Sequence, residues 1–168
     1  MRTTLFSLFL LAQFVIAEKA TAQKLNTFVG GNLILGFPTG DFKDGYKRAT
    51  GIDVSLGFGG KHLYGLGTIG YFSYKEQSGN PYGKITVVPI KAGLRVYPKN
   101  SLFLSGNAGV GFLKDEAMSK RESRFMFDAG IGLHLLVGQI SLNYDGWKRQ
   151  NTDGFSGTIQ LKLGLALK

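Results

Sequence analysis

The last part of the chain alternates strictly between apolar side chains and polar or small ones. Isoleucine or leucine stands at every second position from Ile159 to Leu167, and the positions between them carry Gln, Lys, Gly and Ala. Successive side chains of a β-strand point to opposite faces, whereas a helix, which turns about 100° per residue, would spread the leucines around its circumference. The pattern therefore predicts a strand with one wholly apolar face.

The same alternation recurs in seven earlier segments. We expect eight strands, at about 27–37, 49–58, 62–74, 88–97, 102–112, 124–135, 139–145 and 155–168. A tilted strand needs roughly 9–11 residues to cross a membrane. Most of the predicted strands are close to this length, although 139–145 is shorter. The connections alternate between long and short, which is typical of outer-membrane barrels. The sequence thus predicts an all-β fold, an eight-stranded antiparallel up-and-down transmembrane β-barrel.

The charged residues decide which face of each strand meets lipid. One parity of the predicted strands carries no Asp, Glu, Lys or Arg, and the other carries Asp53, Lys91, Arg95, Arg124, Asp128, Asp145 and Lys162. A Lys or Arg that faces lipid at the midplane costs about 2–4 kcal/mol. We therefore place the apolar parity against lipid; a soluble lipocalin-like barrel would show the opposite sense. In the least regular strand, 62–74, this assignment puts Leu66 and Phe72 outward, opposite Ile69 and Tyr71.

The N-terminal 22 residues have the features of an export signal. A short basic start precedes a 13-residue apolar run, 5–17, and Ala20-Thr21-Ala22 matches a signal-peptidase site. The run is too short to span a bilayer, and no long apolar run follows it. The chain has no Cys, so neither a lipoprotein signal nor disulfides are expected. We predict a cleaved signal peptide at 1–22 and one outer-membrane barrel domain at 23–168.

Eight strands enclose an interior just wide enough for side chains to fill it. Unpaired buried charges are costly, so we expect pairs of opposite sign that close the lumen. The predicted polar network consists of Asn32, Asp53, Lys91, Arg95, Asn107, Asp128, Asn143 and Lys162. The alternative is a narrow pore for small ions.

No catalytic, cofactor or metal site is predicted. The chain has two histidines, His62 and His134, and the topology places both at the periplasmic end, away from outer-leaflet substrates. Two histidines on different strands and no Cys disfavour a metal site. Residues 65–70 match G-x-G-x-x-G, but they lie within a strand and no helix follows, so the dinucleotide-binding mechanism is absent.

The formal net charge of the chain is +9, and the basic residues are scattered, so no nucleic-acid partner is expected. Many of these residues lie in or next to the outer loops: Lys43, Lys47, Arg48, Lys75, Lys114, Lys120, Arg121, Lys148 and Arg149. They could pair with lipopolysaccharide phosphates, or they could form a solvated loop face with the nearby acidic residues.

The aromatic residues gather near the two ends of the predicted strands. The outer set is Phe37, Phe42, Tyr46, Phe72, Tyr74, Tyr82, Phe112, Phe125, Tyr144, Trp147 and Phe155, and the inner set is Phe28, Phe58, Tyr64 and Tyr97. We interpret the two sets as girdles at the bilayer interfaces.

Two segments carry a resemblance to a known family. GNLILGFPTGDF (31–42) and PIKAGLRVYP (89–98) resemble the small outer-membrane β-barrel domains of Bacteroidetes-type bacteria, with the eight-stranded architecture of OmpA/OmpX-like barrels. The resemblance implies a location in the bacterial outer membrane and assembly by the barrel-insertion machinery. Many such chains end in an aromatic residue, whereas this one ends in Leu165-Ala166-Leu167-Lys168.

We expect a monomer with a structural role in the envelope, in contact with outer-membrane lipid and lipopolysaccharide and presenting loops to the exterior. Surface recognition or adhesion through those loops is the main alternative. A narrow pore or a lipid-modifying enzyme is less favoured.

Overall fold

The computed structural model describes residues 26–77, 83–115, 121–148 and 155–168, so the predicted signal peptide lies outside the described residues. The strands are β1 (Asn26–Thr39), β2 (Tyr46–Gly59), β3 (Leu63–Glu76), β4 (Ile85–Val96), β5 (Leu102–Asp115), β6 (Arg121–Leu135), β7 (Gly138–Lys148) and β8 (Phe155–Leu167). One short helix, α2 (Phe42–Gly45), lies in the first connection, where a loop was expected. Within the described ranges, no helix is both long and apolar enough to cross a membrane.

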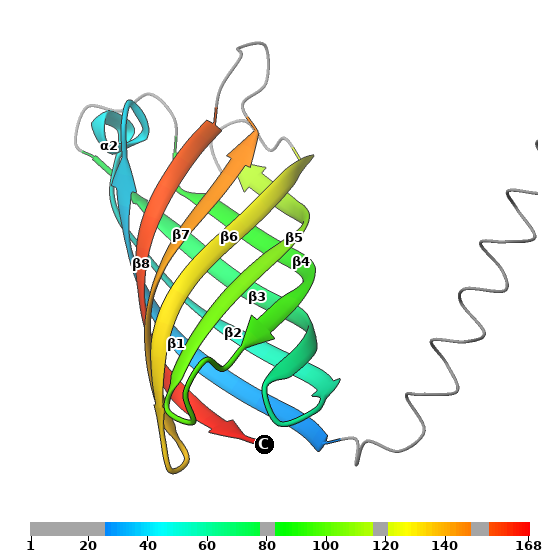
Figure 1. Ribbon diagram of the computed structural model, residues 1–168. Helices are drawn as coiled ribbons and strands as arrows, with labels where there is room; N and C mark the ends of the chain where they lie inside the picture. Colours follow the sequence, from blue (N-terminus) through cyan, green and yellow to red (C-terminus); the bar gives the residue numbers. More distant parts are fainter. Residues whose placement is uncertain (1–25, 78–82, 116–120, 149–154) are drawn as a thin grey trace, which may run out of the picture.

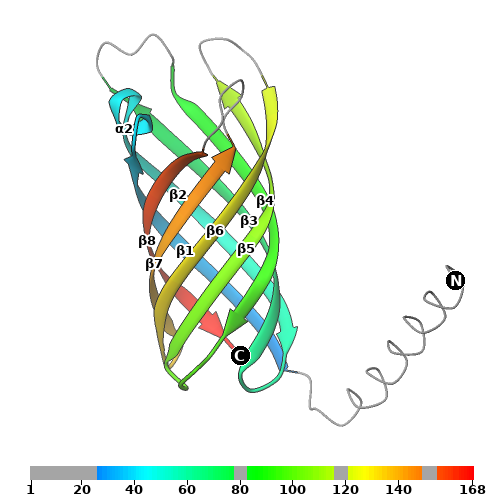
Figure 2. The ribbon, with the colours of Figure 1, turned by 45° about the horizontal axis from the view of Figure 1, so that its top comes forward.

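The eight strands form one closed antiparallel barrel (Figures 1 and 2). Each strand pairs with the next in sequence, and β8 pairs with β1 to close the sheet. Closure leaves no unpaired strand edge, which a β-structure in lipid requires. The predicted fold class is confirmed.

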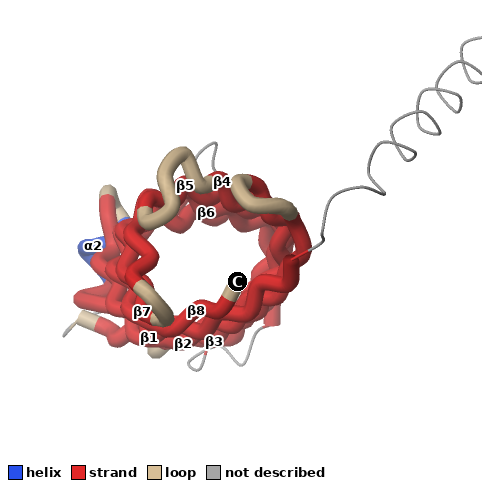
Figure 3. The backbone as a smooth tube through the Cα atoms, turned by 60° about the horizontal axis from the view of Figure 1, so that its bottom comes forward, coloured by secondary structure: helices blue, strands red, loops and turns tan. Residues whose placement is uncertain are grey.

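The two ends of the barrel differ. The short turns β2–β3, β4–β5 and β6–β7 lie at one rim together with the first residue of β1 and the C-terminus (Figures 1 and 3). We call this rim the turn end. The opposite rim carries α2, the last residues of β3, β5 and β7 and the first residues of β4, β6 and β8 (Figure 1), and we call it the loop end.

Several strands extend further toward the loop end than the alternation indicated. β7, for example, has 11 residues rather than the expected seven at 139–145. The added residues bring Lys75, Lys114, Arg121 and Lys148 into strands, where all four are exposed. Since a charge disfavours contact with hydrocarbon, the lipid-facing band ends below these residues.

The outer wall is apolar, and its composition follows the strand register. Val54 pairs with Ile69, and Ile52 pairs with Tyr71, so that all four share the outer face. The outward assignment of Leu66 and Phe72 in β3 was therefore wrong, because both are buried in the lumen. Both faces of this strand carry apolar residues, so composition could not choose between them, whereas pairing with β2 does.

A β-bulge changes the parity of β2 near the loop end. The register shifts between Tyr46, which pairs with Glu76, and Arg48, which pairs with Lys75. The inward residues of this strand are odd-numbered from Ala49 onward, yet Tyr46 is also buried. An extra residue in a strand moves the preceding side chains to the other face. The bulge therefore places the Tyr46 ring inside the barrel.

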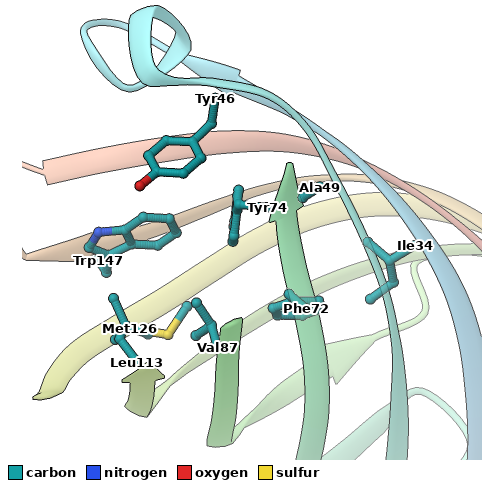
Figure 4. Packing of buried hydrophobic residues seen from close by; sticks show 9 residues of the cluster. All are labelled: Ile34, Tyr46, Ala49, Phe72, Tyr74, Val87, Leu113, Met126 and Trp147. Carbon is teal, nitrogen blue, oxygen red and sulfur yellow. The ribbon is translucent and has the colours of Figure 1, made fainter. Parts of the chain in front are cut away.

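Two apolar clusters fill the ends of the lumen. The loop-end cluster contains Ile34, Tyr46, Ala49, Phe72, Tyr74, Val87, Leu113, Met126 and Trp147 (Figure 4), with Phe42 and Ile85 packed against it. The turn-end cluster contains Phe28, Tyr64, Leu66, Tyr97, Phe103 and Ala166.

These clusters correct the interpretation of the aromatic residues. The aromatic members of both clusters lie inside the barrel, so they are not part of an interfacial girdle. Of the residues in the two predicted sets, Phe37, Phe58, Phe112, Phe125, Tyr144 and Phe155 face outward, and the girdle stays a prediction for these six. Phe42 in α2 packs against the loop-end cluster. Tyr82 lies outside the described residues. Sequence position gives the depth of a residue near a strand end, but the side it faces depends on register.

Candidate functional site: the polar network of the lumen

A buried lysine binds two aspartates in the middle of the lumen. Lys91 Nζ on β4 lies 2.6 Å from Asp145 Oδ2 and 2.5 Å from Asp128 Oδ2. The two aspartates are cross-strand partners on β6 and β7. Asn107 Nδ2 donates a 2.8 Å hydrogen bond to Asp128 Oδ1. One ammonium group thus joins β4 to β6 and β7 across the barrel.

A second network links five strands. Lys162 Nζ on β8 lies 2.8 Å from Asp53 Oδ2, and Asn32 Nδ2 donates to Asp53 Oδ1 at 2.6 Å. Gln139 Nε2 donates to Asn32 Oδ1 at 2.7 Å, and Arg95 Nη1 donates to Gln139 Oε1 at 2.9 Å. The chain of contacts runs from the middle of the lumen toward the turn end.

Arg95 also lies between two aromatic rings. Its guanidinium carbon is 4.6 Å from the centroid of Phe28 and 4.2 Å from that of Phe103. The face of an aromatic ring attracts a cation, and the interaction strengthens when both groups are removed from water. The turn-end cluster therefore holds the charge at the end of the second network.

The buried charges balance. Three cations (Lys91, Arg95 and Lys162) and three carboxylates (Asp53, Asp128 and Asp145) are buried among the described residues. Unpaired charges in a low-dielectric interior are strongly destabilising. The equal numbers therefore leave the buried interior of the described residues without a net charge.

All eight residues predicted for the lumen network point into the barrel, and seven of them join the two networks above. The eighth, Asn143, accepts a hydrogen bond of 2.8 Å from Ser141 Oγ instead. The predicted network lacked two participants, Asp145 and Gln139. Both are polar residues on the inward parity of β7, and that signal could have identified them.

The turn end of the barrel holds both histidines. His62 Nδ1 lies 3.1 Å from the carbonyl oxygen of Tyr97, and His134 Nε2 lies 3.1 Å from the carbonyl oxygen of Ala166. Each imidazole thus has a backbone carbonyl as a hydrogen-bond partner. Within the described ranges, no group of three or more His, Asp or Glu side chains could hold a metal ion.

Lys168 lies across the same rim. Its ammonium nitrogen is 3.7 Å from the centroid of the Tyr97 ring and 3.1 Å from the carbonyl oxygen of Asn100. Partial burial lowers the pKa of Lys168, and the positive charge of Arg95 lowers it further. Burial also raises the pKa of the Tyr97 hydroxyl. Lys168 thus covers part of the turn-end cluster through its contact with the Tyr97 ring.

No protein-family profile matches the chain, and no curated protein matches it significantly. The chain does match solved structures. Ail, the attachment invasion locus protein of Yersinia pestis, is 14% identical, with a TM-score of 0.56 over 86% of this chain and 99% of that one. The N-terminal β-barrel domain of Pseudomonas aeruginosa OprF is 13% identical, with a TM-score of 0.58 over 83% and 97%.

Neisserial surface protein A is 10% identical, with a TM-score of 0.51 over 86% of this chain and 97% of that one. Identities this low establish a common fold, and the assignment to a Bacteroidetes-type group stays a prediction. The alignments cover 97–99% of each solved chain, so the likeness extends over the whole of each solved barrel. The chain therefore has the eight-stranded outer-membrane β-barrel fold of the OmpA/OmpX-like type.

Proposed function

We propose that the chain is an integral protein of the bacterial outer membrane, exported by a signal peptide, with a structural role in the envelope and a closed lumen. The observation that carries this proposal is the layered filling of the barrel. A charge-balanced polar network lies between the loop-end and turn-end clusters. Such an interior supports a packed barrel rather than an open porin.

An ion would have to break several buried contacts to cross this lumen. Lys91 would have to leave Asp128 and Asp145, and the packed aromatic rings of both clusters would have to separate. Breaking one buried ion pair costs about 3–5 kcal/mol. We therefore expect no stable open pore.

Planar-bilayer recording tests the closed lumen directly. The purified barrel should show no stable conductance at neutral pH, and a steady conductance of the size seen for large porins would refute the proposal.

Gel mobility of the membrane-extracted protein, unheated against boiled, tests the location separately. A heat-dependent shift in material from the outer-membrane fraction is expected, whereas soluble periplasmic protein with no shift would contradict it.

The proposed partners are outer-membrane lipid and lipopolysaccharide, with the barrel-insertion machinery acting during assembly of a monomer. The apolar outer wall supports the first of these, and the exposed cations at the loop end support contact with lipid phosphates. Of the basic residues noted for that role, Lys120 and Arg149 lie outside the described residues.

A second candidate function is surface recognition or adhesion through the loop end. The observation that favours it is the shared fold with Ail, which is described as an attachment invasion locus protein. A deletion strain with unchanged attachment to host cells or matrix would argue against it. We propose no enzymatic activity, since the histidines lie at the turn end and contact backbone carbonyls.

A further inference from the structure

A cleft lined by charged and hydroxyl-bearing residues interrupts the apolar outer wall near the loop end. It has a volume of about 420 Å³ and lies across β2 and β3, with Lys84, the residue before β4, on its third side. Its lining consists of Arg48, Thr50, Ser73, Lys75, Glu76 and Lys84. The cleft is on the outside of the barrel, so it is separate from the network in the lumen.

The strand register brings like charges together in this cleft. Arg48 and Lys75 are direct cross-strand partners, and both side chains are exposed. Like charges directly opposite each other destabilise a sheet. An anion between them would remove that repulsion.

The residues below the two cations change polarity in steps. Thr50 pairs with Ser73, which pairs in turn with Thr86 on β4, so that hydroxyl side chains form the next row. The row below that is Ile52 opposite Tyr71, and both side chains are about half exposed on the lipid-facing wall. From the rim downward, the wall thus presents cations, then hydroxyls, then an apolar surface.

This order matches the chemistry of an anionic lipid. The phosphate of such a lipid would lie beside the cations, its sugar or glycerol oxygens beside the hydroxyls, and its acyl chains along the apolar wall. The charges of the lining also agree: three cations and Glu76 give a formal net charge of +2. A phosphate monoester carries about −1.5 to −2 at neutral pH.

We propose that this cleft binds the phosphate group of a phosphorylated outer-leaflet lipid. The site deepens the proposed contact with lipopolysaccharide and rests on the proposed location in the outer membrane. Arg48 on β2 and Lys75 on β3 bind the phosphate. Thr50 and Ser73 contact the adjoining oxygens, and Ile52 packs against the first acyl carbons. With Glu76 included, the net charge of the lining matches one phosphate group.

The chain offers a matched control for the test. Lys114 and Arg121 are also cross-strand partners at the loop end, and both are exposed. The row below them is Phe112 opposite Ser123, which supplies one hydroxyl rather than a continuous row. The control pair therefore has the same charge, but it lies beside the end of the hydroxyl row, where Lys114 pairs with Thr86, and outside the lining of the cleft.

The experiment measures binding of bisphosphorylated lipid A to the folded, detergent-solubilised barrel by native mass spectrometry. The Arg48→Gln/Lys75→Gln variant should lose about tenfold in affinity, since each charge-assisted contact at a partly exposed site contributes a factor of a few. The Lys114→Gln/Arg121→Gln variant should bind as the unmodified chain does. Lipid A stripped of its phosphates should bind the unmodified chain about as weakly as the first variant binds intact lipid A.

Three results would overturn the proposal. Unchanged binding by the Arg48/Lys75 variant removes the site, and an equal loss in both variants assigns the effect to general rim charge. Competition by inorganic phosphate as effective as that by intact lipid A would make the cleft a site for soluble anions. The heat-dependent gel shift and the outer-membrane fractionation of each variant show separately whether the barrel folds and where it resides.

Discussion

Replacing Lys91 with methionine is the most informative perturbation of the lumen. Methionine keeps an unbranched side chain of similar length but removes the ammonium group that contacts both Asp128 and Asp145. The side chains of all three residues are at most 1% exposed. Water therefore cannot readily replace the lost cation, and the substitution leaves three buried carboxylates against two buried cations.

The expected loss of stability follows from these contacts. Breaking a buried ion pair by removing one partner costs about 3–5 kcal/mol, because the remaining charge stays buried without compensation. Asp128 retains the hydrogen bond from Asn107, whereas Asp145 loses its cation entirely. We expect Lys91→Met to lower the free energy of unfolding by about 3 kcal/mol or more at neutral pH.

Urea unfolding of the barrel in lipid vesicles measures this quantity. Trp147 is the only tryptophan of the chain and is buried in the loop-end cluster, so its fluorescence reports unfolding from within the lumen. The unheated gel mobility of each variant shows that it has folded. Lys114→Met, which removes an exposed lysine, should change stability by less than about 0.5 kcal/mol.

A compensating variant tests the reasoning itself. Lys91→Met combined with Asp145→Asn leaves two buried cations and two buried carboxylates, which restores the charge balance of the lumen, and it should recover most of the lost stability. Replacing a buried ionic group by neutral side chains is often close to neutral in free energy. If Lys91→Met alone is as stable as the unmodified chain, or if the double variant is no more stable than the single one, charge balance does not hold this lumen together.

Two further predictions concern packing. Gly93→Ala should lower stability by about 1–3 kcal/mol or prevent folding, because the added Cβ would overlap the carbonyl oxygen of Gly106. Gly106→Ala should be tolerated, because nothing lies within 4 Å of the added Cβ. Urea titration of both variants measures the difference. The centroids of the Phe42 and Trp147 rings are 4.8 Å apart, so Phe42→Ala should lower stability by about 1–2 kcal/mol. The same substitution should shift the Trp147 emission to longer wavelength and increase its quenching by acrylamide. Unchanged quenching would show that α2 does not cover the loop-end cluster.

The alternation of the sequence determined the fold and the inside and outside of most strands. Each strand residue must suit either lipid or a crowded lumen, and lipid penalises a single charge directly. A local pattern therefore carries that information, as the leucines of 159–167 and the inward Lys162 show. The even number of strands and the alternating connections then follow from the count of such segments.

Tertiary structure decided which lumen residues meet. Lys91 and Asp145 are 54 positions apart, and Lys162 and Asp53 are 109 apart, so only barrel closure and register bring them together. The inward parity identified the candidates, but nothing in the sequence favoured one partner over another.

Register also decided the cases in which both faces of a strand are plausible. β3 is apolar on both sides, and pairing with β2 turned Ile69 outward and Phe72 inward. A single bulge moved Tyr46 from the outer wall into the loop-end cluster, and the same bulge precedes Arg48 at the cleft across β2 and β3. Parity is a local property, but the face to which each parity belongs is set by hydrogen bonds to residues distant in the chain.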